Sequence, residues 1–163
     1  MSPVVVDIHT AVEVRHDGRW QRVRTKFSGS AGGRTNEVFE HPDYRIFGFL
    51  ADVRNYAHSP VIAAPRGLPA DADVVGDEFD SWRTEFFSVS WLTLAELQAY
   101  DYDELFWDRR IQREGNCAAL AQEGGGEQRL LRDFLTPYFF ERVDLLARLG
   151  PPEEVRIIFG FDS

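Results

Sequence analysis

This chain of 163 residues has very little cysteine and no long apolar run. Cys117 is the only cysteine, which excludes an intrachain disulfide and a zinc site built from cysteines, and we expect it to be an inert core residue. No apolar run reaches the roughly 18 residues that a membrane-spanning helix needs, and the first residues do not resemble a signal peptide. We therefore expect a cytoplasmic protein that does not bind membranes.

Lysine is almost missing as well, because Lys26 is the only lysine among 18 basic residues. The arginine bias is typical of a genome rich in G and C, and it also fits selection for guanidinium contacts to carboxylates or phosphates. The formal net charge of −9 argues against general nucleic-acid binding. A local cluster of arginines would still allow a small anionic ligand.

Apolar residues are abundant, at 44% of the chain, and aromatic residues make up 13%. These values are typical of a folded protein with a sizeable core, and the length fits a single domain over residues 1–163. Strand-forming segments lie near both ends of the chain and helical patterns lie between them. The sequence therefore predicts an α+β fold, in which a small antiparallel or mixed sheet is formed by an N-terminal hairpin and the C-terminal strand and is covered by helices.

The segment VVVDIHTAVEV, residues 4–14, predicts a strand with an unusual polar face. Because alternate side chains of a strand point to opposite faces, the even positions form an apolar face, whereas Asp7, His9 and Glu13 share the other. The Asp7 and His9 side chains lie roughly 6.6 Å apart along the strand, so their tips can meet at one ligand. A polar face exposed to solvent is the alternative reading.

Local signals predict most of the remaining elements. Asp17-Gly18 is typical of a hairpin turn, Thr93 and Glu96 form a capping box, and Pro137 breaks a helix. The elements expected after the first strand are a returning strand at 20–25, a mobile loop at 28–36, a helix at 43–54, an irregular segment at 55–73, a short helix at 74–82, a helix from Thr93, an extended or partly helical segment at 102–114, a loop at 123–127, a broken helix at 127–149 and a strand at 154–161.

Five stretches carry a resemblance: VDIHTAVEVRHDGRW, YRIFGFLADVRNY, APRGLP, SWLTLAEL and EEVRIIFGFD. In these stretches, which span nearly the whole chain in order, it resembles a widespread family of small uncharacterised proteins from bacteriophages and actinobacteria. The resemblance implies a phage or prophage origin, hence a host bacterial cytoplasm, and no established activity. Relatives often carry an Asp-x-His-Ser element before SW, whereas this chain has Glu85 and Phe87 in EFFSVSW, which weighs against metal or proton-transfer chemistry.

Binding of a small nucleotide-like ligand is the first functional hypothesis. Such a site needs arginines for phosphate, carboxylates or amides for ribose hydroxyls and an aromatic face for the base. Besides Asp7, His9 and Glu13, the candidate binding residues are Arg54, Asn55, Tyr56, Arg66, Ser88, Ser90 and Trp91. With a phage origin, the protein would sequester a nucleotide-derived immune signal of the host. No cofactor, metal ligand or catalytic residue is assigned.

Two alternatives stay open. The first is an inhibitor that binds a host enzyme, and the second is a metal-dependent hydrolase or phosphodiesterase that uses Asp7 and His9. Arg54, Arg66 and Trp91 also have structural interpretations: a charge at a helix end, a loop brace and core packing. The sequence leaves open whether the protein is an enzyme, with binding favoured over catalysis. A free sheet edge would allow a homo-oligomer.

Overall fold

The computed structural model describes residues 5–110 and 126–163, so the expectations for Cys117 and for residues 123–125 lie outside the described residues. The chain divides into two compact units, each described here by itself. Unit 1 comprises Met1–Pro42, Pro65–Ala99 and Phe140–Ser163, and unit 2 comprises Asp43–Ala64 and Tyr100–Phe139. Helices and antiparallel strands both occur, which confirms the α+β class, whereas the single domain stays a prediction.

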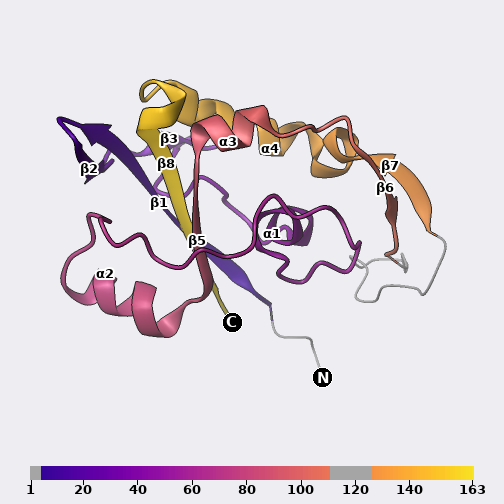
Figure 1. Ribbon diagram of the computed structural model, residues 1–163, viewed down its shortest axis with the longest axis horizontal. Coiled ribbons are helices and arrows are strands. Elements are labelled where there is room, and N and C mark those ends of the chain that lie inside the picture. Colours follow the sequence, from indigo (N-terminus) through magenta and orange to yellow (C-terminus); the bar gives the residue numbers. More distant parts are fainter. Residues whose placement is uncertain (1–4, 111–125) are drawn as a thin grey trace. The chain divides into compact units, whose positions relative to one another are not determined.

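Unit 1 is built on a four-stranded sheet with the strand order β2-β1-β8-β5 (Figure 1). All neighbouring strands are antiparallel. The N-terminal hairpin and the C-terminal strand therefore pair as predicted. The bounds of the four strands are β1 Asp7–His16, β2 Arg19–Arg22, β5 Phe87–Thr93 and β8 Val155–Asp162.

The turn between β1 and β2 confirms the predicted hairpin. Asp17 and Gly18 both have positive φ angles, 49° and 75°, as a two-residue turn with the twist of a hairpin requires. This turn sets the register, in which Arg15 lies opposite Trp20. The returning strand ends at Arg22 rather than at residue 25, although the backbone N–H of Val23 still donates to the carbonyl of Val12 at 2.8 Å. The backbone N–H of Arg22 donates to the carboxylate of Asp73 at 2.8 Å.

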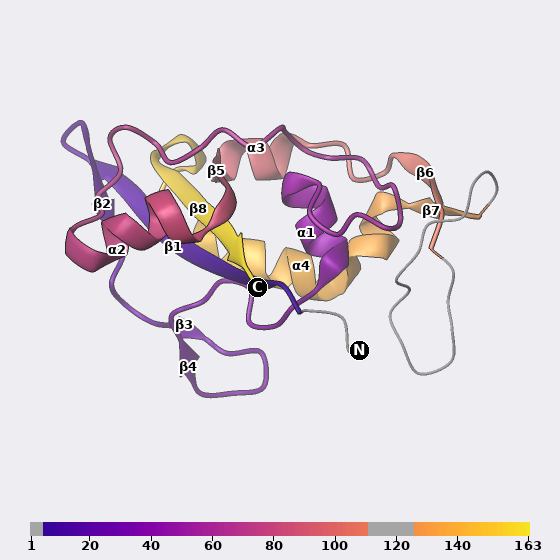
Figure 2. The same ribbon diagram turned by 90° about the horizontal axis from the view of Figure 1, so that it is seen from below.

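The two faces of β1 have different neighbours. The even-numbered side chains are mostly buried, as predicted. On the odd-numbered face, Ala11 packs with Ile158 and Trp82 in an apolar cluster. Figure 2 shows α2 (Gly76–Asp80) lying over this side of the sheet, followed by the π-helical turn η1 (Ser81–Glu85). The helix predicted at 74–82 is thus shorter and continues as a wider turn, and the polar face of β1 is covered at its middle.

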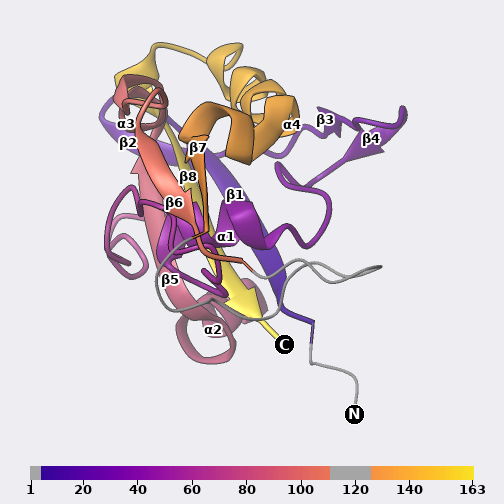
Figure 3. The ribbon, with the colours of Figure 1, turned by 90° about the vertical axis from the view of Figure 1, so that its right-hand side faces the viewer.

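The segment predicted as a mobile loop at 28–36 contains two short strands, β3 (Phe27–Ser28) and β4 (Arg34–Thr35), which pair as a small ribbon (Figure 3). Arg142 anchors this part of unit 1. Its buried guanidinium donates to the carbonyl oxygens of Val38 at 2.5 Å, Ser28 at 2.7 Å and Glu37 at 3.0 Å. Residues 29–33 form the predicted loop, while the short ribbon at its ends and the brace from Arg142 were not predicted, because glycine content does not reveal a partner that is distant in the chain.

The helix α3 (Leu94–Ala99) begins as the capping box predicts. The backbone N–H of Glu96 donates to Thr93 Oγ1, and the backbone N–H of Thr93 donates to Glu96 Oε1, each at 3.1 Å. The strand β5 before it was not predicted. Its backbone partners come from β8, and a bulge at Ser88, with φ 50°, interrupts its alternating pattern.

Unit 2 contains α1 (Tyr44–Ala51) and a two-stranded ribbon of β6 (Leu105–Asp108) and β7 (Glu127–Leu130). α1 begins at Asp43, whose side chain accepts from the backbone N–H of Arg45, and ends at Asp52, which has φ 59°. The helix predicted over 43–54 is confirmed with a shorter end. The helix predicted from residue 127 is wrong for 127–130, because these residues pair with β6.

The helix α4 (Leu131–Ala147) follows β7 directly. Thr136, the residue before Pro137, has φ 69° and ψ 162°, so the helix is interrupted there. The ring of a proline crowds the preceding residue and removes a helical hydrogen bond, which is the physical reason for the predicted break. A short 3-10 turn, η2 (Pro152–Glu154), leads into β8.

Candidate ligand-binding site

A cavity of about 470 Å³ lies in unit 1, on the side of the sheet that carries the odd-numbered residues of β1. This volume falls in the range of about 300–1,000 Å³ that small-molecule pockets occupy. Arginines and tryptophans dominate its wall. The five residues of these two types that line it are Arg15, Trp20, Arg66, Trp91 and Arg156, and we call them the arginine–tryptophan stack.

The stack alternates cations with aromatic rings. Trp20 lies between two guanidinium groups, with the Cζ of Arg15 at 5.5 Å and the Cζ of Arg156 at 4.1 Å from its ring centre. Trp91 lies between Arg156 at 5.7 Å and Arg66 at 4.8 Å. A cation over an aromatic face stabilises by about 0.5–2 kcal/mol, depending on burial. The stack therefore holds three positive charges at one cavity of an acidic protein.

Strand register explains why these side chains meet. Arg15 lies opposite Trp20 across β1 and β2, and Glu13 lies opposite Arg156 across β1 and β8. Residues directly opposite in an antiparallel pair point to the same face, so these side chains share one side of the sheet. Arg66 reaches the same side from the irregular segment before α2, where its guanidinium lies over the Trp91 ring.

Arg156 is the most deeply buried member of the stack, with 2% of its surface exposed. Its Nε donates to Glu13 Oε1 at 2.8 Å, and Glu13 is fully buried. Nη2 also lies 2.6 Å from Glu13 Oε1, but the angle does not make a hydrogen bond, so Nη2 has no such partner among the described residues. Nη1 lies 3.0 Å from Oδ1 of Asp71.

The wall opposite the sheet is formed by the segment from Arg66 to Asp73, which is fastened at both ends. The backbone N–H of Arg66 donates to Ser90 Oγ at 2.9 Å, and that of Gly67 donates to the carbonyl of Val89 at 2.8 Å. At the other end, the backbone N–H of Asp73 donates to Glu13 Oε2 at 2.5 Å. Glu13 thus holds both the buried arginine and the covering segment.

The other two arginines form bidentate pairs with carboxylates. Arg66 donates to Glu96 at 2.9 and 2.5 Å, and Arg15 donates to Glu154 at 2.6 and 2.9 Å. The hydrogen bond from Arg66 lowers the pKa of Glu96 to about 2, against the opposing effect of burial. An anionic ligand must therefore use the remaining N–H groups or replace a carboxylate.

Four of the ten predicted binding residues gather at this cavity. Arg66 and Trp91 line it, Glu13 holds Arg156, and Ser90 holds the covering segment. The alternation of side chains along β1 indicated Glu13. The other three were indicated by the types of group that a nucleotide site needs.

Asp7 and His9 lie at the opposite end of β1 from Arg15. His9 Nε2 lies 2.9 Å from Asp162 Oδ1, and its ring stacks on Phe86 with ring centres 4.3 Å apart. Asp7 is exposed and lies opposite Asp162 in the register. Neither residue lines the cavity of the arginine–tryptophan stack. Ser88 occupies the bulge of β5 and does not line it either.

Arg54, Asn55 and Tyr56 belong to unit 2. Arg54 Nη1 donates to the hydroxyl of Tyr56 at 2.9 Å. The Asn55 amide donates to Asp52 Oδ1 at 2.9 Å, and its oxygen accepts from the backbone N–H of Ser59 at 3.0 Å. These three residues therefore make local contacts that shape the segment after α1.

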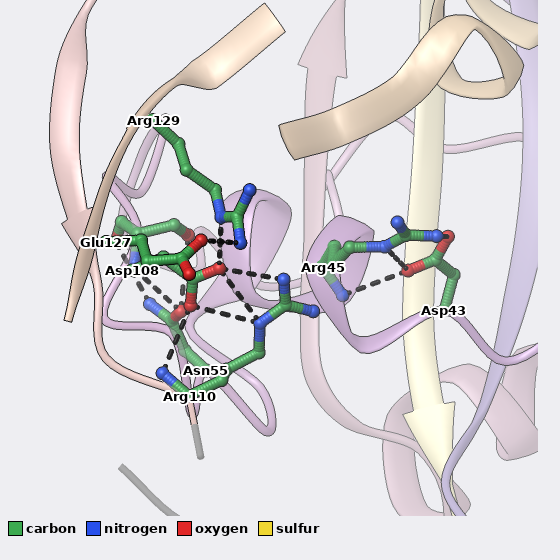
Figure 4. Close-up of polar contacts among 8 residues, drawn as sticks. Asp43, Arg45, Asn55, Asp108, Arg110, Glu127 and Arg129 are labelled. Carbon is green, nitrogen blue, oxygen red and sulfur yellow. Dashed lines mark hydrogen bonds and ion pairs between the residues drawn. The ribbon is translucent and has the colours of Figure 1, made fainter. Parts of the chain in front are cut away.

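A second polar cluster in unit 2 was not predicted (Figure 4). The buried Asp108 accepts a bidentate pair from Arg110, at 3.0 and 2.8 Å, and a bond from Arg129 Nε at 2.8 Å. Burial raises the pKa of Asp108, but the hydrogen bonds from the two arginines outweigh it and hold the pKa below its ordinary value. The bond from Arg129 of β7 to Asp108 of β6 joins the two strands, and Arg129 also donates to Glu127 within β7 at 2.6 Å.

Sequence reasoning missed Arg15, Trp20, Asp71 and Arg156 at the cavity. The Asp17-Gly18 turn contained the signal for the first two, since a two-residue hairpin places Arg15 opposite Trp20. Arg156 is the only charged residue of β8 before Asp162 at its end, and its neighbours in the strand are apolar, which marks it as a charge that needs a buried partner. Asp71 had no signal, because its position depends on the path of an irregular segment.

Within residues 5–110 and 126–163, no group of three or more His, Cys, Asp or Glu side chains is arranged to hold a metal ion. In the same ranges, no helix has the length and apolar character needed to cross a membrane. Comparison with known proteins returned no match among protein-family models, curated proteins or solved structures.

Proposed function

We propose that unit 1 binds a small ligand that combines a planar aromatic group with an anionic group, as a nucleotide does. The observation that carries this proposal is the arginine–tryptophan stack at a cavity of about 470 Å³. Both parts of such a ligand find suitable groups there. Guanidinium groups bind phosphate or carboxylate oxygens, and the flat faces of tryptophan and arginine accept an aromatic base.

Guanidinium donors, rather than an excess of positive charge, support an anionic ligand in this protein of net charge −9. Arg15, Arg66 and Arg156 line the cavity, but each is paired with at least one carboxylate: Glu154, Glu96, and Glu13 with Asp71. Glu153 also lines the cavity, so an anionic ligand has to compete with these carboxylates for the guanidinium groups. Arginine has five N–H donors, so a guanidinium bound to one carboxylate retains donors for a second anion.

The chemistry of the wall favours binding over turnover. Among the described residues that line the cavity, Thr93 carries the only hydroxyl group, and no histidine or cysteine lies there. The wall also carries two carboxylates, Asp71 and Glu153, which are its candidates for general acid–base catalysis. Asp71 is paired with Arg156, so Glu153 is the carboxylate of the wall that would remain for such a role. With the phage origin that the resemblance implies, we infer a protein that sequesters a nucleotide-derived signal.

Isothermal titration calorimetry of the full chain with the four ribonucleoside 5′-monophosphates, adenosine and inorganic phosphate tests the proposal. We expect at least one monophosphate to bind more tightly than adenosine and phosphate do. Arg66→Gln should weaken that binding about tenfold, because it removes a charged hydrogen-bond donor from the cavity wall. The ligand should be recovered intact after heat denaturation.

Arg45→Gln is the matched control, because Arg45 forms a bidentate pair with Asp43 in unit 2 and is about as exposed as Arg66. This variant should bind the same monophosphate as the wild type does. The proposal is refuted if no monophosphate binds, or if Arg66→Gln and Arg45→Gln change the affinity equally.

A further inference from the structure

The two sides of the Arg156 guanidinium have different hydrogen-bond and ion-pair partners. The side formed by Nε and Nη2 faces Glu13, with Nε at 2.8 Å and Nη2 at 2.6 Å from the same oxygen. Nη1 lies 3.0 Å from Asp71 Oδ1, and Nη2 has no hydrogen-bond partner in the described parts of the chain. Asp71 thus pairs with Nη1 alone. A phosphate or carboxylate group, which has at least two oxygens, would bind Nη1 and Nη2 together.

The two carboxylates that contact Arg156 differ in how easily they can leave. Glu13 is fully buried and also accepts the backbone N–H of Asp73, so moving it would leave a charge in the interior. The side chain of Asp71 is 66% exposed, so it returns to water at little cost. An incoming anion would therefore replace Asp71 and leave Glu13 in place.

The covering segment does not depend on Asp71 for its attachment. Arg66 and Gly67 are bound to β5 through Ser90 Oγ and the carbonyl of Val89. Asp73 is bound on the other side, through its backbone N–H to Glu13 and through its carboxylate to the backbone of Arg22. A movement of Asp71 away from Arg156 is thus a local change between two fixed points.

We infer that Asp71 stands in for the anionic group of the ligand and that binding displaces it from Arg156. This inference rests on the proposed function, and it specifies the ligand: a phosphate or carboxylate that reaches Arg156 between Trp20 and Trp91, whose ring centres lie 4.1 and 5.7 Å from its Cζ. Asp71 then acts as an internal competitor. It keeps the buried arginine paired in the empty protein and lowers the affinity for weak anions.

Asp71→Asn tests the inference, because it keeps the shape of the side chain and removes its charge. Titration calorimetry should show that the variant binds a ribonucleoside 5′-monophosphate, and inorganic phosphate, about two- to fivefold more tightly than the wild type does, the range that loss of an exposed ion pair allows. Adenosine, which carries no anion, should bind both proteins equally. Thermal unfolding checks that the variant is folded.

Asp103→Asn is the matched control. Asp103 is 71% exposed and lies 3.1 Å from Arg132 in unit 2, so the aspartate itself resembles Asp71 in exposure and in distance to its arginine, whereas Arg132 is 52% exposed and Arg156 is buried. This variant should bind like the wild type. If the wild type binds a monophosphate and Asp71→Asn binds it no more tightly, the inference fails and the proposed function stands. If the wild type binds none of the four, both fail. An equal gain for adenosine also overturns the inference.

Discussion

Glu13 and Arg156 face each other across β1 and β8, and both are buried on the side of the sheet that carries the cavity. Arg156 Nε donates to Glu13 Oε1 at 2.8 Å, and the same glutamate fastens the segment that covers the cavity. The pair therefore connects the core of unit 1 to its candidate site. Transfer of two charges from water to such a place is costly, so each partner depends on the other.

Arg156→Met should destabilise unit 1 by about 3–5 kcal/mol, because it leaves the charge of Glu13 buried without a partner. Combining it with Glu13→Leu should recover much of this loss, since no buried charge then remains. Urea denaturation of the single variants and the double variant measures the coupling between the two side chains. Additive effects of the two substitutions would show that the pair is not coupled in this way.

Gly160→Ala should destabilise unit 1 by about 1–3 kcal/mol through crowding on β8. A Cβ at Gly160 would lie 3.0 Å from the Cβ of Phe86 and 3.1 Å from a methyl group of Val89. Gly150→Ala is the control, because its Cβ would meet Val155 at an ordinary 3.7 Å and should change stability by less than about 0.5 kcal/mol. Thermal or urea unfolding compares the two, and equal effects would contradict the packing.

Glu96 should make stability depend on pH in the acid range. The hydrogen bond from Arg66 holds its pKa at about 2 in the folded protein, below the ordinary value of 4.5. The stabilisation is therefore fully present above about pH 4.5 and is lost as the pH falls through about 2. The difference in unfolding free energy between the wild type and Glu96→Gln should shrink over this window. A carboxyl titration by NMR with a midpoint near 4.5 would contradict the pairing.

Tyr100 should cause a loss of stability in the alkaline range. Burial, together with its hydrogen bond to Glu104, raises its pKa from 10 to about 12, and burial also raises the pKa of Tyr102. The folded protein keeps these phenols neutral, so their contribution is present below pH 10 and is lost as the pH rises through about 12. Ultraviolet titration of the wild type and Tyr100→Phe should show one high-pKa tyrosine missing from the variant. Identical titration curves would contradict this prediction.

Apart from the pairing of the two chain ends, the predictions that succeeded depend on residues close together in the chain. The turn at Asp17-Gly18, the capping box of Thr93 and Glu96 and the break before Pro137 each involve a few neighbouring residues. Strand alternation also placed Glu13 on the polar face of β1 correctly. Such features follow from steric limits and hydrogen bonds within one or two turns of backbone.

The predictions that failed involve partners far along the chain. β5 was missed because β8 supplies its backbone partners, and the residues of β7 pair with β6 instead of extending a helix. The arrangement of the candidate site belongs to the same class. Alternation places Asp7 and His9 on the same face as Glu13, yet the cavity forms only at the end where Arg156 lies opposite Glu13.

The sequence by itself determined the α+β class and the polar character of one strand face, because propensity and periodicity act over a few residues. It also indicated the pairing of the two ends, because strand patterns at both ends with helical patterns between them are typical of one sheet covered by helices. Only the tertiary structure decided which arginines meet which tryptophans, and which carboxylates balance them. Those contacts join side chains from β1, β2, β5 and β8, and their geometry depends on strand register and on the path of the covering segment. The local turn sets the register of β1 with β2, but the registers of β8 with β1 and with β5 follow from how whole strands pack against one another, so no local pattern contains them.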